Sequence, residues 1–231
     1  VFLIMAPFGL KPYGIFILST WVVMTIAACT SGVDKGIRLV SELNLYSAGA
    51  MLLPGLWRRT PTAAAKEALE DAGWEDGPPG DPERAACVIG TGIGGIGTLE
   101  GQHIVMRDQG AERISPLSIP LLMANAASGV VAMKHDLRGQ SFGTVSACAA
   151  GAHAIGMAER LIRYGDADCV VTGGSEAAIT PLATAAFGRM DALSDSGISR
   201  PFDRRRDGFV MGEGAGVVIL EELEHARRRG A

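Results

Sequence analysis

Hydrophobic and polar positions alternate between two patterns from residue 61 onward. Stretches with apolar residues three or four apart, typical of helices, are separated by short continuous apolar runs that are typical of buried strands. The helical spacing predicts helices over residues 62–73, 117–133, 149–164 and 223–229. The apolar runs predict strands over residues 85–89, 141–147, 167–172 and 215–221. This alternation predicts an α/β protein built on a sheet.

Residues that break regular structure mark the ends of these segments. Thr62 is expected to cap the first helix, and Gly73 to end it. The glycine- and proline-rich stretch 76–82 continues neither a helix nor a strand, so it predicts a surface loop. Gly165 closes the helix that ends at Tyr164.

The amino-terminal region allows three interpretations. Tyr13–Cys29 is almost uncharged over 17 residues, at the lower limit for a membrane-spanning helix. It also resembles an export signal, because Ile26–Cys29 has the form of a lipoprotein cleavage box. The third interpretation is a buried central strand, because Thr20–Ile26 is rich in β-branched residues. We favour the strand, since the rest of the chain has the pattern of a soluble protein, and leave residues 1–20 unassigned.

Composition and charge exclude several classes of function. The chain has 231 residues, of which 48% are hydrophobic, and 25 acidic against 21 basic residues give a formal charge of −4. The charges are mixed along the chain, so no cationic surface for nucleic acid is expected. The cysteines lack C-x-x-C spacing, which argues against a metal site and a disulfide framework and for a reducing, cytoplasmic location. They are Cys29, Cys87, Cys148 and Cys169.

A glycine-rich segment follows the first predicted strand. Gly92–Gly97 has the spacing G-x-G-x-x-G, which in dinucleotide-binding proteins lets backbone amides approach a pyrophosphate. Such sites also need an acidic residue that ends a second strand about twenty residues further on. Glu112 has that distance but no apolar strand before it. A tight structural turn or the wall of a substrate pocket is therefore the favoured interpretation, and no cofactor is predicted.

Cys148 lies where a predicted strand ends and a predicted helix begins. The amides and the dipole at a helix amino terminus favour negative charge and thus the reactive thiolate. The small neighbours Ala147 and Ala149 leave room for a substrate carbonyl, and the Cys148 N–H is a candidate oxyanion donor. A lone cysteine is also often a small buried hydrophobe, so position alone leaves the two interpretations balanced.

The other cysteines and the histidines offer less. Cys87 and Cys169 lie inside apolar runs and are expected in the core, whereas Cys29 is undecided. His153 follows Cys148 by five residues, about 140° around a helix, and is expected to point away. His103 and His135 are expected to be exposed, and His225 belongs to the charged last helix. The chain therefore lacks an evident acid or base for Cys148.

Three consecutive arginines, Arg204–Arg206, lie between Asp203 and Asp207. They are candidates for holding an acidic partner such as a carrier protein or its phosphate. The simpler interpretation is a solvated or salt-bridged loop, and we favour it.

Several motifs together resemble one family. Thr144–Gly151 (TVSACAAG) is similar to the active-site cysteine motif of beta-ketoacyl-acyl carrier protein synthases. Three further segments agree with that family in order, which makes four motifs in all. They are Thr91–Gly95, Gly173–Pro181, and Ser199–Asp203 continuing through Arg206–Gly216. The resemblance is nearly continuous from about residue 62 to residue 231, and is closest to the elongating type-II enzymes of fatty acid and aromatic polyketide assembly.

The resemblance implies a fold, a reaction and partners. It implies a thiolase-like half-fold over residues 21–231, with a mixed five-stranded sheet covered by helices, in a homodimer. Cys148 would accept an acyl group from acyl carrier protein, and malonyl-acyl carrier protein would then supply the carbanion for a decarboxylative condensation. Ile93 and Phe187 fall where the family lines its acyl pocket. A cysteine at position 148, where inactive chain-length factors have glutamine, implies an active member.

Two departures limit this expectation. The two histidine motifs and the lysine of the family's second half do not occur in these 231 residues, so the chain is expected to be incomplete and able at most to transfer an acyl group to Cys148. Residues 22–32 match the family's first strand only loosely. Two alternatives stay open. One is a non-catalytic half-fold that pairs with another synthase chain, and the weaker one is a lipoprotein anchored through Cys29. Acyl length and pathway also stay open.

Overall fold

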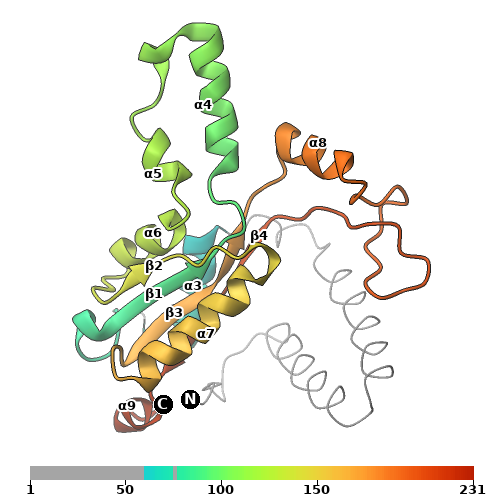
Figure 1. Ribbon diagram of the computed structural model, residues 1–231. Helices are drawn as coiled ribbons and strands as arrows, with labels where there is room; N and C mark the ends of the chain where they lie inside the picture. The colour runs from blue at the N-terminus through green and yellow to red at the C-terminus, as the bar shows by residue number, and fades with distance from the viewer. Residues whose placement is uncertain (1–59, 75–76) are drawn as a thin grey trace. The chain divides into compact units, whose positions relative to one another are not determined.

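The structure is a computed structural model that describes residues 60–74 and 77–231 (Figure 1). The described residues belong to two compact units. The first comprises the described residues up to Thr180 together with Glu213–Ala231, and the second is Pro181–Gly212. The predictions for residues 1–59, which include the strand over Thr20–Ile26 and the role of Cys29, lie outside the described residues.

A mixed sheet forms the centre of the first unit. Its strands are β1 (Ala85–Gly90), β2 (Ser141–Phe142), β3 (Cys169–Glu176) and β4 (Gly214–Glu221). They lie in the order β2-β1-β3-β4, with β1 parallel to both neighbours and β3 antiparallel to β4. The predicted α/β architecture with a mixed sheet is confirmed. The described part of the chain forms a four-stranded sheet instead of the five strands predicted, and the segment predicted as the remaining strand lies outside it.

Within the described residues, three helices of the first unit pack against this sheet, and the second unit contains one α-helix. The α-helices are α3 (Pro61–Asp71), α4 (Ile96–Gln109), α5 (Ser118–Leu122), α6 (Ala126–Lys134), α7 (Ala150–Arg163), α8 (Pro181–Arg189) and α9 (Leu223–Arg228). Short 3₁₀ turns lie at η1 (Pro82–Arg84), η2 (Ala111–Arg113) and η3 (Ala147–Ala149). None of the helices in residues 60–74 and 77–231 is long and apolar enough to cross a membrane.

The two faces of the sheet are covered by different helices. Side chains of β1 alternate between the faces: Cys87 and Ile89 pack with α3 and α6, whereas Ala86 and Val88 pack with α7. Figure 1 shows α7 along one face and α3 on the other. The buried residues of α7 recur at helical spacing and are Ala150, Ala154, Ala158, Leu161 and Ile162. The hydrophobic pattern predicted α7 correctly because the apolar residues on one face of that helix are buried against the sheet.

Four predicted elements differ from the structure. The strand predicted over 167–172 is β3, which continues through Gly173 and Gly174 to Glu176. The first helix begins at Pro61, and Thr60 rather than Thr62 caps it, because the Thr60 hydroxyl accepts from Ala63 N at 3.2 Å. The helix predicted over 117–133 is two helices, because the backbone is extended at Met123 and the Leu122 carbonyl turns to accept from Gly95 N. The strand predicted over 141–147 ends at Phe142, because the chain then turns toward α7.

Two helices were not predicted. The helix α4 contains no buried residue, and apolar side chains such as Leu99 and Ile104 are exposed on it. It projects away from the sheet in Figure 1, so its sequence has no one-sided apolar pattern to detect. Pro181 begins α8, which buries only Ala183.

Charged residues hold the amino ends of β1 and β3. Arg84 forms a bidentate ion pair with Asp168, with both nitrogen–oxygen distances 2.7 Å. Glu221, only 4% exposed, accepts two hydrogen bonds from Arg229 and lies 2.7 Å from His225 Nδ1. This carboxylate raises the pKa of Arg229. The Glu221 contacts attach α9 and the residue that follows it to the end of β4.

Candidate active site

Cys148 lies in the 3₁₀ turn η3, between β2 and the amino terminus of α7, and its side chain is exposed. The strand-to-helix placement predicted from the sequence is confirmed in outline. The buried-hydrophobe interpretation is wrong for this cysteine, because the thiol is exposed. Its role as a nucleophile stays a prediction.

A row of glycines brings α7 close to the sheet beside Cys148. Gly90, Gly174 and Gly216 are register partners across β1, β3 and β4. Gly151, in the first turn of α7, lies over this row, and a Cβ added at Gly174 would be 3.2 Å from the Gly151 Cα. A Cβ added at Gly90 would be 2.2 Å from the Ala150 carbonyl oxygen. The absence of side chains therefore sets the position of the helix that carries Cys148.

The backbone before Cys148 makes a strained turn that is tied to β1. Ala147 has a φ of 50°, a left-handed conformation that residues other than glycine rarely adopt. The Thr144 hydroxyl donates to the Ala150 carbonyl at 2.7 Å, and the Thr91 N–H donates to the Thr144 carbonyl at 3.0 Å. Strain of this kind is common where a side chain must be presented to a substrate.

The Cys148 N–H has no acceptor among the residues that the structure describes. The next amide, Ala149 N, donates to the Ser146 carbonyl at 3.1 Å. An unused amide at the start of a long helix suits the stabilisation of a developing oxyanion. The geometry thus supports the donor role predicted for this N–H.

The other described cysteines are buried in the sheet, as predicted. Cys87 and Cys169 are at most 1% exposed. Burial raises the pKa of each thiol to about 12. Both side chains therefore stay protonated near neutral pH and serve as core hydrophobes.

The histidines do not supply a direct partner for Cys148. His153 Nδ1 lies 2.6 Å from the Ser146 hydroxyl, and no hydrogen bond joins it to Cys148 in the described chain. His103 is exposed and His225 contacts Glu221, consistent with the predictions. The prediction for His135 is wrong: it is half-buried, and burial, then the charge of Lys134, lowers its pKa. Its place against the core keeps it from solvent.

The glycine loop lies against the Cys148 turn and binds a carboxylate of the protein itself. The Gly92 and Ile93 amides donate to Glu176 Oε2 at 2.7 and 3.2 Å. A Cβ added at Gly92 would lie 3.5 Å from the Ala147 Cα, so the space between the loop and the turn is no wider than a methyl group. The helix α4 does follow the loop directly. The Gly92 and Ile93 amides of the loop already donate to Glu176, however, which argues against the dinucleotide alternative. Glu112 lies in η2 and is exposed.

The predicted pocket residues lie in different units. Ile93, in the glycine loop of the first unit, is 43% exposed. Phe187, on α8 in the second unit, packs edge-to-face against Phe209 with ring centroids 5.3 Å apart. Phe209 also lines a hollow of about 590 Å³ in that unit. The roles of Ile93 and Phe187 in binding an acyl chain stay predictions.

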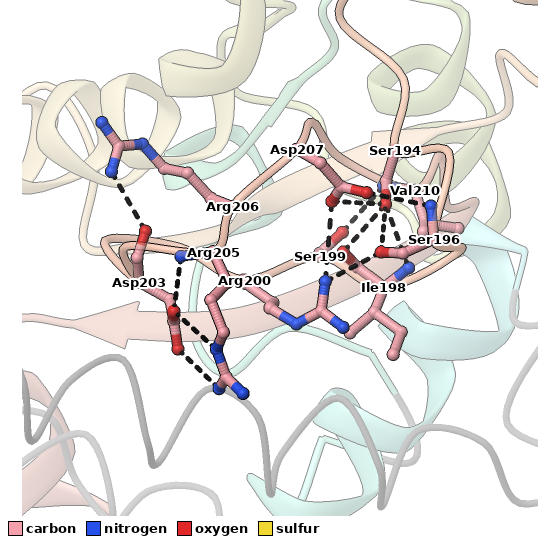
Figure 2. A network of polar contacts seen from close by, with 10 residues as sticks. All are labelled: Ser194, Ser196, Ile198, Ser199, Arg200, Asp203, Arg205, Arg206, Asp207 and Val210. Atoms are coloured by element: carbon pink, nitrogen blue, oxygen red, sulfur yellow. Dashed lines mark hydrogen bonds and ion pairs between the residues drawn. The ribbon is translucent and has the colours of Figure 1, made fainter.

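The arginine loop in the second unit is a network of polar contacts, shown in Figure 2. Asp203 accepts from Arg205, which lowers the pKa of Asp203 to about 2. Asp207 accepts from the Ser194 hydroxyl at 2.8 Å, and this contact, with that from Ser196 N, lowers its pKa to about 2. The favoured interpretation of a salt-bridged loop is confirmed for Arg205. Arg206 donates to the Asp203 carbonyl.

Comparison with known proteins identifies the family. The model of the beta-ketoacyl synthase N-terminal domain matches residues 58–226. This chain belongs to the beta-ketoacyl synthase family. The match includes both the Cys148 turn and the glycine loop, and extends through the second unit.

Individual synthases agree with this assignment. The chain is 50% identical to a 3-oxoacyl-[acyl-carrier-protein] synthase 2 of Rhizobium meliloti over 175 residues, which are 73% of this chain and 42% of that protein. A type II polyketide ketosynthase, solved in complex with its acyl carrier protein, matches at 30% identity with a TM-score of 0.66, over 77% of this chain and 46% of that one. The ishigamide ketosynthase/chain length factor matches at 34% identity and a TM-score of 0.63, over 74% and 42%.

This beta-ketoacyl synthase chain thus spans less than half the length of the synthases that it matches. Its thiolase-like half-fold is the part that carries Cys148. Glu176 is a residue that sequence reasoning missed as part of the site. It lies in the Gly173–Pro181 segment that resembles the family, and only the fold brings it to the glycine loop, 84 positions from Gly92.

Proposed function

We propose that this chain supplies the acyl-accepting part of a 3-oxoacyl-acyl carrier protein synthase. The observation that carries the proposal is the exposed Cys148 thiol at the start of α7, beside a backbone amide that no described residue uses. The similarity to 3-oxoacyl synthases and to a ketosynthase bound to its carrier protein supports the substrate class.

The proposed step is a transthioesterification. The Cys148 thiolate attacks the carbonyl carbon of an acyl-carrier thioester, and the Cys148 N–H donates to the oxygen as negative charge develops there. The bond between that carbon and the carrier sulfur then breaks, the acyl group stays on Cys148, and the carrier leaves as a thiolate that takes up a proton.

The condensation is proposed for the whole protein. There, malonyl-acyl carrier protein would lose carbon dioxide, and the resulting carbanion would attack the acyl group on Cys148 to give a beta-ketoacyl carrier. The histidines of this chain do not contact Cys148. We therefore propose that these 231 residues carry out at most the acyl transfer and not the condensation. Ile93 and Phe187 are proposed to contact the acyl chain.

Partners follow from the same proposal. Acyl carrier protein is the donor, and the synthase acts as a homodimer or paired with a second synthase chain, an arrangement supported by the ketosynthase/chain length factor pair that this chain resembles. The unpaired, buried thiols Cys87 and Cys169 suit the reducing cytoplasm, where we place the protein.

Incubation with a radiolabelled acyl-carrier thioester tests the proposal. We expect stable, hydroxylamine-sensitive label on the unaltered protein and none on the C148A variant. Equal labelling of both proteins, or none on either, would contradict the acyl-transfer role and favour a half-fold that only pairs with another synthase.

A further inference from the structure

We infer that Glu176 is a positioning residue that holds the glycine loop against the Cys148 turn and so determines how long-chain acyl groups reach the thiol. The inference rests on the proposed acyl transfer and adds a residue that selects among its substrates. It is built from contacts within the first unit only.

The Glu176 carboxylate accepts hydrogen bonds from three successive residues of the glycine loop. Its Oε2 accepts from the Gly92 and Ile93 amides at 2.7 and 3.2 Å, and the Thr91 hydroxyl lies 3.3 Å from Oε1. Thr91 in turn accepts from Gly94 N at 3.0 Å. The carboxylate therefore holds the whole turn from Thr91 to Gly94.

Within the described part of the chain, backbone amides rather than a cation hold Glu176. Neither a lysine nor an arginine pairs with it within residues 60–74 and 77–231. This differs from Glu221, which binds Arg229. A half-buried carboxylate that binds backbone amides instead of a cation fixes the geometry of those amides, because charge-assisted hydrogen bonds are short and directional.

The held loop lies next to the Cys148 turn and also carries an exposed apolar side chain. A single methyl group added at Gly92 would contact Ala147, the residue before Cys148. Ile93, the next residue, is exposed and is the predicted wall of the acyl pocket. Glu176 thus connects the end of β3 to both the nucleophile turn and Ile93.

The chemistry predicts what each substitution does. In E176A the Gly92 and Ile93 amides lose their acceptor and Ile93 loses its fixed position. In E176Q the side-chain amide oxygen still accepts, although without charge, so most of the geometry is retained. In G92A the added Cβ would lie 2.9 Å from Glu176 Oε2 and would displace the carboxylate without a change at position 176.

Alkylation of Cys148 by two maleimides tests the inference without acyl transfer. The rates with N-ethylmaleimide and N-dodecylmaleimide are measured at one pH on the unaltered chain and on the variants, with the Cys148 peptide quantified by mass spectrometry. We expect the long-to-short rate ratio to fall about fivefold in E176A and in G92A, and E176Q to stay within about twofold of the unaltered ratio. E112A, an exposed carboxylate in η2, should leave the ratio unchanged.

An unchanged ratio in E176A and G92A would overturn the inference, as would an E176Q ratio as low as that of E176A. Hydrogen exchange at Gly92 and Ile93 gives the matching structural readout, and we expect about tenfold faster exchange in E176A. Failure of the proposed function is distinguishable, because it would show as no acyl label on the unaltered protein while the maleimide ratios still depended on Glu176.

Discussion

The two ends of the central sheet differ in the residues that pack there: ion pairs at one end and glycines at the other. At the amino ends of β1 and β3, charged side chains meet charged side chains, as in Arg84–Asp168 and Glu221–Arg229. At the other end, the strands meet in glycines, and the carboxylates of Glu176 and Glu213 accept hydrogen bonds from backbone amides. The first end attaches elements to each other. The second removes side chains so that α7 and the glycine loop can approach one another and present Cys148.

The glycine end should tolerate side chains least. In G90A the added Cβ would lie 2.2 Å from the Ala150 carbonyl, so α7 must move or the strand must bend. We expect a loss of about 3 kcal/mol or more in the free energy of unfolding, measured by urea denaturation. G156A is the matched control, because nothing lies within 4 Å of that Cβ on the exposed side of α7, and it should gain about 0.5 to 1 kcal/mol. Equal stability of the two variants would contradict the close approach.

The charged end should depend on its buried pair. R229M keeps the apolar stem but leaves the Glu221 carboxylate with His225 alone. We expect a loss of about 3 kcal/mol in the free energy of unfolding, because the carboxylate stays buried. R227M removes an exposed pair with Glu224 and should cost less than about 0.5 kcal/mol. A similar small loss in both variants would show that Glu221 is not held as described.

A smaller effect is expected from acid at the same end. Hydrogen bonding from Arg84 lowers the pKa of Asp168 below its ordinary value of 3.8. Its contribution is therefore present above pH 4 or so and is lost as pH falls through and below that value. D168N should be less stable than the unaltered protein at neutral pH and should lose less stability between about pH 5 and 3. Identical pH profiles of unfolding would contradict this role.

The same contrast explains what the sequence could and could not predict. The strands β1 and β3, and the helix α7, were predictable because each buries a regular set of apolar residues. The strand β4 is largely half-buried and was predictable from its continuous apolar run. The exposed helix α4 was not, since it buries nothing. The position of Cys148 at a strand-to-helix turn was predictable from the local pattern. The early end of β2 at Phe142 was not predicted.

Long-range contacts explain the missed part of the site. Glu176 lies 84 residues from Gly92 in the sequence, and its neighbours give no sign of the partner. The parallel pairing of β1 with β3, which aligns Gly90 with Gly174, brings the two segments to one edge. The spacing of the glycines allowed an external pyrophosphate only as the less favoured interpretation, and in the structure two amides of the loop bind an internal carboxylate instead.

The most direct test of the proposed acyl transfer is to locate the acyl group on the protein. The unaltered chain is incubated with an acyl-carrier thioester, digested without reducing agent, and its peptides are analysed by mass spectrometry. We expect the acyl adduct on the peptide that contains the exposed Cys148, and none on the buried Cys87 or Cys169. An adduct on either buried cysteine, or no adduct at Cys148, would contradict it.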